Sequence, residues 1–207
     1  MALDFEKQFY SNKVKLIAGC DEAGRGCLLG PVVAAAVVFP KGYKSELIND
    51  SKQLSEKQRE KAYKEIVDNA LSYGVGIVEA TKIDEINILE ASKLAMEIAL
   101  SQLKCDYDLI LTDAVKLNNA KVEFIPIIKG DAKALCIAAA SIIAKVTRDH
   151  MCYELDKQYP EYNIAQNKGY GTKDHLDALD QYGPVEGLHR FSYKPIKQRI
   201  FKQLKLF

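Results

Sequence analysis

Leu16–Phe39 reads LIAGCDEAGRGCLLGPVVAAAVVF, two apolar runs separated by two adjacent acids and a glycine-containing turn. Branched and small apolar residues of this kind are typical of buried strands, so we expect a hairpin. The acids are Asp21 and Glu22, and the turn contains Gly24, Arg25 and Gly26. Adjacent carboxylates disfavour each other's ionisation unless a cation meets them. On this pair alone, a solvated acidic turn and a cation site are equally good interpretations.

The length and composition limit the class of protein. A chain of 207 residues with 48% hydrophobic residues can form one domain with a full core, but not two large ones. Its formal net charge of +1 indicates no global affinity for nucleic acid or membranes, so any basic surface has to be local. One candidate is the segment 187–207, which contains six Lys or Arg residues and no acid.

Targeting and cysteine patterns indicate the compartment. No stretch reaches the ~18 to 20 consecutive apolar residues of a membrane span, and the charged N-terminus does not resemble a signal sequence. The five cysteines are an odd number without Cys-x-x-Cys spacing, which is atypical of disulfide frameworks and structural zinc sites. We expect a cytoplasmic protein without membrane attachment, whose cysteines are small buried hydrophobic residues.

Hydrophobic periodicity predicts strands interspersed with helices. Short β-branched runs indicate strands, whereas amphipathic or alanine-rich segments indicate helices. The expected strands are 14–20, 31–39, 73–78, 107–111 and 122–128. The expected helices are 55–70, 83–103, a long alanine-rich helix after Asp131 with Asp131 as its N-cap, 174–181, and a basic helix from about residue 194. This order predicts an α/β sheet with mixed strand pairing.

Acids follow the strand-type runs repeatedly. Asp21 and Glu22 end the first run, and Asp113 and Asp131 follow later ones. Because sites in α/β sheets lie at the carboxyl ends of strands, we expect these acids at one edge of the sheet. Carboxylates without supporting Cys or His favour Mg²⁺ or Mn²⁺, and two such ions are a standard arrangement for phosphodiester cleavage. Taken singly, each acid is equally a turn residue, a helix cap or a solvated side chain; their recurrence favours a metal site.

The glycine turn also invites a dinucleotide-binding interpretation. Gly24-x-Gly26 is followed by Gly30, one position too late, and leads into a strand-type run instead of a helix, so that fingerprint fails. The two glycines still leave backbone amides accessible to a phosphate or sugar, with Arg25 as a charge partner.

A series of motifs in order along the chain resembles the successive motifs of ribonuclease HII. They are GCDEAGRGCLLGPVVAAAVV, NDSKQLSEKQRE, NILEASKLAM, LTDAV, KGDAKALCIAAASIIAKVTRDH, NKGYGTKDH and GLHRFSY. They cover about residues 14–195. The related ribonuclease HIII usually carries Gly-Lys-Gly in the turn and an extra N-terminal domain, for which this chain has no room. The resemblance therefore favours HII.

This resemblance implies a fold and an activity. The expected fold is a ribonuclease H-like α/β domain over 1–207, with a central mixed five-stranded sheet flanked by helices and a C-terminal helical substrate-binding extension over about 160–207. The expected activity is endonucleolytic hydrolysis of the RNA strand of RNA/DNA hybrids, and nicking at ribonucleotides embedded in duplex DNA, leaving 3′-hydroxyl and 5′-phosphate ends. The expected cofactor is Mg²⁺ or Mn²⁺, with two ions during catalysis, and the protein is expected to be a monomer.

The resemblance also assigns roles to individual residues. The implied catalytic and metal-binding acids are Asp21, Glu22, Asp113 and Asp131. The residues implied to bind substrate are Gly24, Arg25, Gly26, Lys52 and Tyr170. The Gly-Arg-Gly turn contacts the ribose 2′-hydroxyl, the group that distinguishes RNA from DNA, and the tyrosine stacks on the following deoxyribose. The lysine and the basic C-terminal segment are candidates for phosphate contacts.

Two positions depart from the family pattern. Cys27 stands where proline is common, and Ala114 follows Asp113 where glycine is usual. We expect the thiol to alter the stiffness of the turn and the β-carbon at 114 to narrow the approach to the metal site. Because neither residue replaces a ligand, activity should survive.

The C-terminus carries a separate motif. Gln203–Phe207 reads QLKLF and resembles the QLxLF pentapeptide by which bacterial replication and repair proteins dock on the sliding clamp. Such a peptide binds through its Leu and Phe side chains in an apolar groove. The alternative is a terminal helix that packs Leu204 and Phe207 against its own domain.

Two other classes of function stay open at this stage. One is a noncatalytic binder of RNA/DNA hybrids, and the other is a Mg²⁺-dependent enzyme that acts on a small phosphate ester. A complete set of four acids favours the nuclease over the binder, because carboxylates repel phosphate unless metal is present. A basic surface would favour nucleic acid over a small ester.

Overall fold

The computed structural model describes the backbone of residues 3–204 and the side chains of residues 3–200. Its centre is a five-stranded sheet in the order β3-β2-β1-β4-β5. The strands are β1 (Ile17–Ala23), β2 (Val32–Val38), β3 (Ser72–Val78), β4 (Leu109–Asp113) and β5 (Phe124–Ile127). Strands β1, β2 and β3 pair antiparallel, whereas β4 pairs parallel with both β1 and β5. The expected hairpin of β1 and β2 and the expected mixed sheet are both confirmed.

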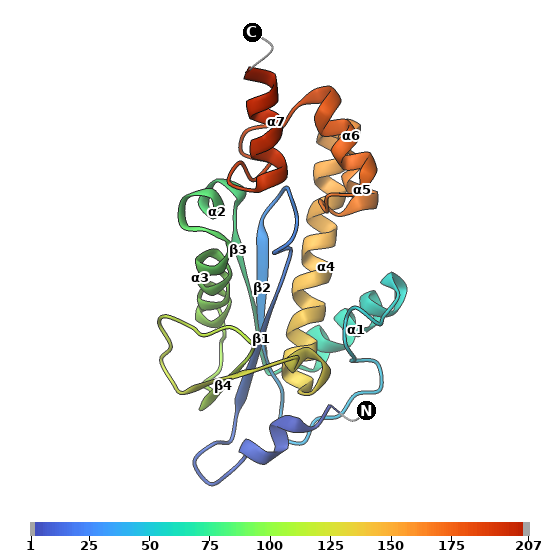
Figure 1. The fold of residues 1–207 in the computed structure, drawn as a ribbon. Coiled ribbons are helices and arrows are strands. Elements are labelled where there is room, and N and C mark those ends of the chain that lie inside the picture. The colour runs from blue at the N-terminus through green and yellow to red at the C-terminus, as the bar shows by residue number, and fades with distance from the viewer. Residues whose placement is uncertain (1–2, 205–207) are drawn as a thin grey trace.

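Helices cover both faces of this sheet, as Figure 1 shows. On one face lie α2 (Ala80–Ile86) and α3 (Ile88–Ser101), and on the other lie α1 (Glu56–Asn69) and α4 (Leu135–Gln158). Small residues let α4 approach the sheet closely, since a Cβ added at Gly19 would lie 2.2 Å from the backbone carbonyl carbon of Cys136. No helix within residues 3–204 is long and apolar enough to cross a membrane.

The chain after α4 forms a helical part at one end of the sheet (Figure 1). It contains α5 (Ile164–Asn167), α6 (Lys173–Tyr182) and α7 (Lys194–Leu204). Three short 3₁₀ segments complete the described elements: η1 (Phe5–Phe9), η2 (Gly130–Ala132) and η3 (Pro160–Tyr162). The predicted C-terminal helical extension therefore exists, and it begins just after α4 ends.

The prediction of one helix over 83–103 is wrong, because the structure divides this segment at Asn87. This residue has a φ of 68°, outside the right-handed helical region. Its side-chain oxygen accepts hydrogen bonds from the amides of Leu89 and Glu90 and so caps α3. The apolar periodicity continues across the break, so the pattern of hydrophobic residues alone does not reveal it.

The prediction that Asp131 caps the long helix is also wrong. Asp131 lies in η2, and α4 begins four residues later at Leu135 without a side-chain cap from its own N-cap residue. The carboxylate of Glu6 in η1 instead accepts a hydrogen bond from the Leu135 amide. Burial raises the pKa of Glu6 to about 7. A distant segment thus caps α4, which leaves the side chain of Asp131 to another role.

Candidate active site

Three carboxylates meet where β1, β4 and η2 come together. The parallel register pairs Cys20 with Thr112, so the next residues along the two strands, Asp21 and Asp113, are neighbours. Asp131 joins them from η2, and one oxygen of each carboxylate lies within 4.8 Å of the others. Within the described residues, no other group of three acid, histidine or cysteine side chains is this compact.

Glu22 is the fourth predicted acid, and it lies apart from this trio. Both adjacent acids are inside β1, although the sequence pattern placed the end of the strand before them. Glu22 is close enough to raise the pKa of Asp21, but it does not belong to the group whose oxygens lie within 4.8 Å of one another. The Arg25 guanidinium donates to Oε1 of Glu22 at 3.0 Å, while Oε2 is buried without a partner among the described residues. One oxygen of Glu22 therefore lacks a donor or a cation.

Burial makes the ionised form of these acids costly. It is the main cause that raises the pKa of Asp21 well above its usual range, and the charges of Glu22 and Asp113 add to it. Burial likewise raises the pKa of Asp113, with a further contribution from Asp131. The pKa of Glu22 is raised by burial despite the opposing effect of Arg25. An all-oxygen cluster that repels itself fits a hard divalent cation, which would stabilise the ionised carboxylates.

A lysine contacts the cluster from the solvent side. The Lys52 ammonium lies 2.8 Å from Oδ2 of Asp131, and this hydrogen bond raises the pKa of Lys52. The lysine side chain is 76% exposed, so it remains accessible to a ligand. An ion pair this exposed contributes little to stability.

A cavity of about 350 Å³ opens beside the carboxylates. Its lining residues are Asp21, Glu22, Ala23, Gly24, Arg25, Gly26, Ser51, Lys52, Arg59, Asp113, Ser141, Lys145 and Tyr170. Of the sequence-predicted site residues, only Asp131 is missing from this lining, and it contacts the cavity through Lys52. A larger cavity of about 760 Å³, lined in part by Tyr63, His150 and Leu188, contains none of them.

The basic wall of the smaller cavity, formed by Arg59 and Lys145, was not predicted from the sequence. The Lys145 ammonium lies 2.5 Å from Asp149, and the Arg59 guanidinium lies 3.9 Å from the same carboxylate. Arg59 also donates to the carbonyl oxygens of Ser51 and Leu54 at 3.2 and 2.6 Å. The spacing of Lys145 and Asp149 shows that they are neighbours on a helix, but not which face of α4 they occupy.

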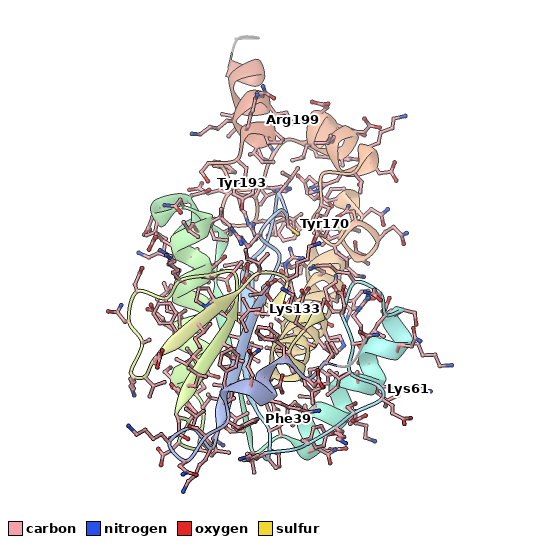
Figure 2. The ribbon with its side chains drawn as sticks, turned by 60° about the horizontal axis from the view of Figure 1, so that its bottom comes forward. Phe39, Lys61, Lys133, Tyr170, Tyr193 and Arg199 are labelled. Carbon is pink, nitrogen blue, oxygen red and sulfur yellow. The ribbon has the colours of Figure 1, made fainter. Side chains whose placement is uncertain are left out.

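The glycine turn lies against Arg148 of α4 and against Tyr170 of the C-terminal helical part. Gly24 has a φ of +94°, and a Cβ added there would lie 2.2 Å from Nε of Arg148. A Cβ on Gly26 would lie 3.8 Å from a ring carbon of Tyr170. Figure 2 shows Tyr170 where the sheet meets the C-terminal helices, and its side chain is half-exposed. The tertiary structure therefore brings the two predicted sugar-binding elements together.

The two atypical positions have different structural consequences. Ala114 has a φ of 56°, in the left-handed region that favours glycine. Cys27 is buried, and its thiol donates to the carbonyl oxygen of Lys168 at 3.4 Å. Cys27 therefore links the glycine turn to the segment that carries Tyr170.

The basic C-terminal segment is only partly a surface. Arg190 is completely buried, which corrects its assignment to a solvent-facing patch. Arg199 is largely covered and lies 3.1 Å from Asp180. Residues 205–207 of the pentapeptide Gln203–Phe207 lie outside the described residues, and no side chain of that peptide is described.

Comparisons with known proteins agree with this geometry. Residues 18–196 match the family model described as Ribonuclease HII. The chain is 55% identical over 191 residues to the ribonuclease HII of Ruminiclostridium cellulolyticum, an alignment that covers 92% of this chain and 74% of that protein.

Solved structures show the same architecture. The ribonuclease H2 from Pyrococcus horikoshii OT3 is similar with a TM-score of 0.79 at 29% identity, over 92% of this chain and 99% of that one. A chain of the PCNA:RNase HII complex from Archaeoglobus fulgidus is similar with a TM-score of 0.68 at 25% identity, over 86% and 95% of the two chains. Fold and sequence thus point to one family.

Proposed function

Because the chain belongs to the ribonuclease HII family and is a ribonuclease H acting on RNA/DNA hybrids, we propose that it also nicks duplex DNA at single embedded ribonucleotides. The observation that carries this proposal is the position of Tyr170 against Gly26, in the same cavity as the carboxylates. An enzyme that cuts at one ribonucleotide must place the groups that recognise the ribose within one nucleotide of the reacting phosphate. This cavity offers both elements.

The carboxylates are the proposed metal ligands. Asp21, Asp113 and Asp131 would hold divalent metal between them, and the partnerless oxygen of Glu22 makes it the fourth proposed ligand. When bound, two Mg²⁺ or Mn²⁺ ions supply the positive charge that activates a water and stabilises the leaving 3′-oxygen. Attack of water on phosphorus with cleavage of the P–O3′ bond leaves 3′-hydroxyl and 5′-phosphate ends.

The other cavity residues have proposed roles in holding the substrate. Lys52 contacts Asp131 and is exposed, so its ammonium can hold a phosphate oxygen next to the carboxylates. The backbone of Gly24–Gly26 reads the 2′-hydroxyl, and the half-exposed ring of Tyr170 packs against the following deoxyribose. The helical extension from about residue 160 is the proposed second wall for the duplex.

Product mapping on one labelled duplex tests this function. The duplex carries a single ribonucleotide, and Mg²⁺ and Mn²⁺ are compared. We expect one cut beside the ribonucleotide, with 3′-hydroxyl and 5′-phosphate ends, and no cut in the matched all-DNA duplex. Cleavage of long hybrids without cleavage at the single ribonucleotide would refute the proposal and leave the ribonuclease H activity standing.

The C-terminal pentapeptide Gln203–Phe207 is proposed to dock on a sliding clamp. The enzyme itself is proposed to be a monomer. The motif QLKLF and the fold similarity to an RNase HII chain solved with PCNA support it. Deletion of residues 203–207 should abolish binding to the bacterial clamp in a titration and leave nuclease activity on a short duplex unchanged. Undiminished clamp binding would refute this role.

A further inference from the structure

The carbonyl oxygen of Arg25, in the middle of the glycine turn, accepts two hydrogen bonds from the C-terminal helical part. Nη1 of Arg190 donates at 3.0 Å, and the hydroxyl of Tyr193 donates at 2.6 Å. The same Nη1 lies 2.9 Å from the Tyr193 hydroxyl oxygen. The three groups therefore form a closed triangle, which restricts the orientation of the Arg25 carbonyl.

Arg190 is itself held rigidly. It is completely buried, and its Nε donates to the carbonyl oxygen of Gly30 at 3.0 Å. Its backbone amide donates to the carbonyl oxygen of Leu28 at 2.8 Å. Among the described residues it forms no ion pair with a carboxylate, and only Nη2 lacks a hydrogen-bond partner. Arg190 thus connects the middle of the turn to the segment that leads into β2.

The orientation of the Arg25 carbonyl determines that of the next amide. The peptide bond between Arg25 and Gly26 is trans and planar, so its C=O and N–H groups point in opposite directions. Because the carbonyl points toward the buried Arg190, the Gly26 amide points away from it. Gly26 is exposed, and no acceptor for its N–H group occurs among the described residues. The amide is therefore available to a ligand beside Tyr170.

We propose that Arg190 and Tyr193 are positioning residues that aim the Gly26 amide at the ribose 2′-oxygen and so determine selectivity for ribonucleotides. This inference rests on the proposed function, in which the glycine turn reads the sugar. A donor that is already oriented binds its acceptor without a further loss of conformational entropy. Once the triangle is broken, the peptide plane can rotate, and the amide then recognises the 2′-oxygen less often.

Tyr193→Phe tests the inference with a minimal change, since it removes one donor and keeps the ring. Two duplexes are compared in Mn²⁺, identical except that the single ribonucleotide carries a 2′-hydroxyl or a 2′-fluorine, which is a poor hydrogen-bond acceptor. We expect kcat/KM on the hydroxyl duplex to fall about three- to tenfold, the loss typical of one hydrogen bond. Cleavage of the fluoro duplex should stay the same, so the selectivity ratio falls. Arg190→Lys should lower the ratio further.

Tyr43→Phe is the matched control. The Tyr43 hydroxyl also donates one side-chain hydrogen bond, to Glu65 at 2.8 Å, and its ring stacks on Phe39. Figure 2 shows Phe39 at the end of the molecule opposite to Tyr193. This variant should keep the wild-type selectivity ratio. A general loss of stability would lower cleavage of both duplexes and the melting temperature, which separates it from a positioning effect.

A measurement without substrate completes the test. The ¹³C chemical shift of the Arg25 carbonyl reports its hydrogen bonds, and it should change in Tyr193→Phe but not in Tyr43→Phe. An unchanged selectivity ratio overturns the inference, whether or not the carbonyl shift moves. A wild-type enzyme that cuts both duplexes equally well would instead refute the proposed function, a result distinct from a wild-type preference that survives Tyr193→Phe.

Discussion

Two groups of buried charges on either side of the glycine turn differ in how they are compensated. On the side of the sheet, Asp21 and Asp113 face each other and Asp131, and the pKa of each of the first two is raised by burial. On the side of the C-terminal helices, Arg148 and Arg190 are buried more deeply still. The arginines, however, donate mainly to backbone carbonyl oxygens.

Arg148 shows how complete this compensation is. Its three guanidinium nitrogens donate to the carbonyl oxygens of Pro31, Lys168 and Leu29 at 3.1, 2.8 and 3.1 Å. Carbonyl oxygens solvate a cation without being charged themselves, so Arg148 needs no counter-ion from outside the protein. The carboxylates have no equivalent set of donors. We infer that the acidic group performs the chemistry, whereas the basic group holds the turn.

The largest expected effect concerns the acidic group. Asp21→Asn should reduce cleavage by about 10³-fold or more, because it removes a proposed ligand of the metal whose charge would stabilise the transition state. Without metal the same variant should melt at a higher temperature than the wild type, since it removes one of three clustered charges. Cleavage assays with and without divalent metal, together with thermal melting, test both expectations. Retained cleavage would contradict a role of the acidic group in the chemistry. A lower melting temperature without metal would contradict the inference that these carboxylates lack compensation.

The next effect concerns the basic group. Arg148→Met should lower the free energy of unfolding by about 3–5 kcal/mol, because it leaves three buried carbonyl oxygens without hydrogen-bond donors. Urea denaturation measures this loss. Lys157→Met is the control, since Lys157 forms an ion pair with Glu154 in which both side chains are exposed, and it should change stability by less than about 1 kcal/mol. Equal effects of the two variants would show that burial of Arg148 matters less than we infer.

A buried histidine pair next to the arginines gives a pH-dependent prediction. Nδ1 of His175 lies 2.9 Å from the carbonyl oxygen of Tyr170, its Nε2 lies 3.3 Å from Nε2 of His189, and Nδ1 of His189 accepts from the Val185 amide at 3.0 Å. This row of hydrogen bonds accommodates only two ring protons, one on each imidazole. Both histidine rings are therefore neutral. Burial, with a smaller contribution from His175, lowers the pKa of His189 from 6.5 to about 4.

The sign of the effect follows from proton binding. Between pH 6.5 and about 4 the unfolded chain binds a proton at His189 that the folded protein does not, so this residue lowers stability as the pH falls through that window, by about 3 kcal/mol. Glu6 acts in the opposite direction, because its raised pKa favours proton binding in the fold. Stability of the wild type minus that of His189→Gln, measured by urea denaturation from pH 7 to pH 4, isolates the histidine. A difference that does not vary with pH would contradict a neutral pair.

The smallest expected effect concerns Ala114, the residue that follows Asp113 of the acidic group. Ala114→Gly should raise the free energy of unfolding by about 0.5 kcal/mol, because relief of the left-handed backbone slightly exceeds the entropy cost of glycine. Thermal melting at matched pH measures it. Cleavage should change little, since the substitution touches no ligand; a loss of stability would show that the alanine side chain contributes packing near Asp113.

Much of the fold and the acidic group could be predicted from local patterns. The alternation and length of apolar runs predicted the five strands, because a strand's burial repeats every second residue. The same runs placed Asp21, Asp113 and Asp131 after strands, and ordered motifs indicated the family. The exceptions were local as well: Asn87 interrupts a continuous apolar pattern, and Asp131 lies in η2 instead of capping the long helix.

The sequence by itself therefore determined the sheet, the acids at its edge and the family, because each depends on near neighbours along the chain. Only the tertiary structure decided that Glu6 caps α4, that Lys52 contacts Asp131, and that Arg190 supports Arg25. These contacts join segments far apart in sequence, where neither spacing nor composition selects the partner. A lone basic residue in a basic segment is expected to be solvated, whereas the fold surrounds Arg190 with the carbonyl oxygens of Gly30 and Arg25.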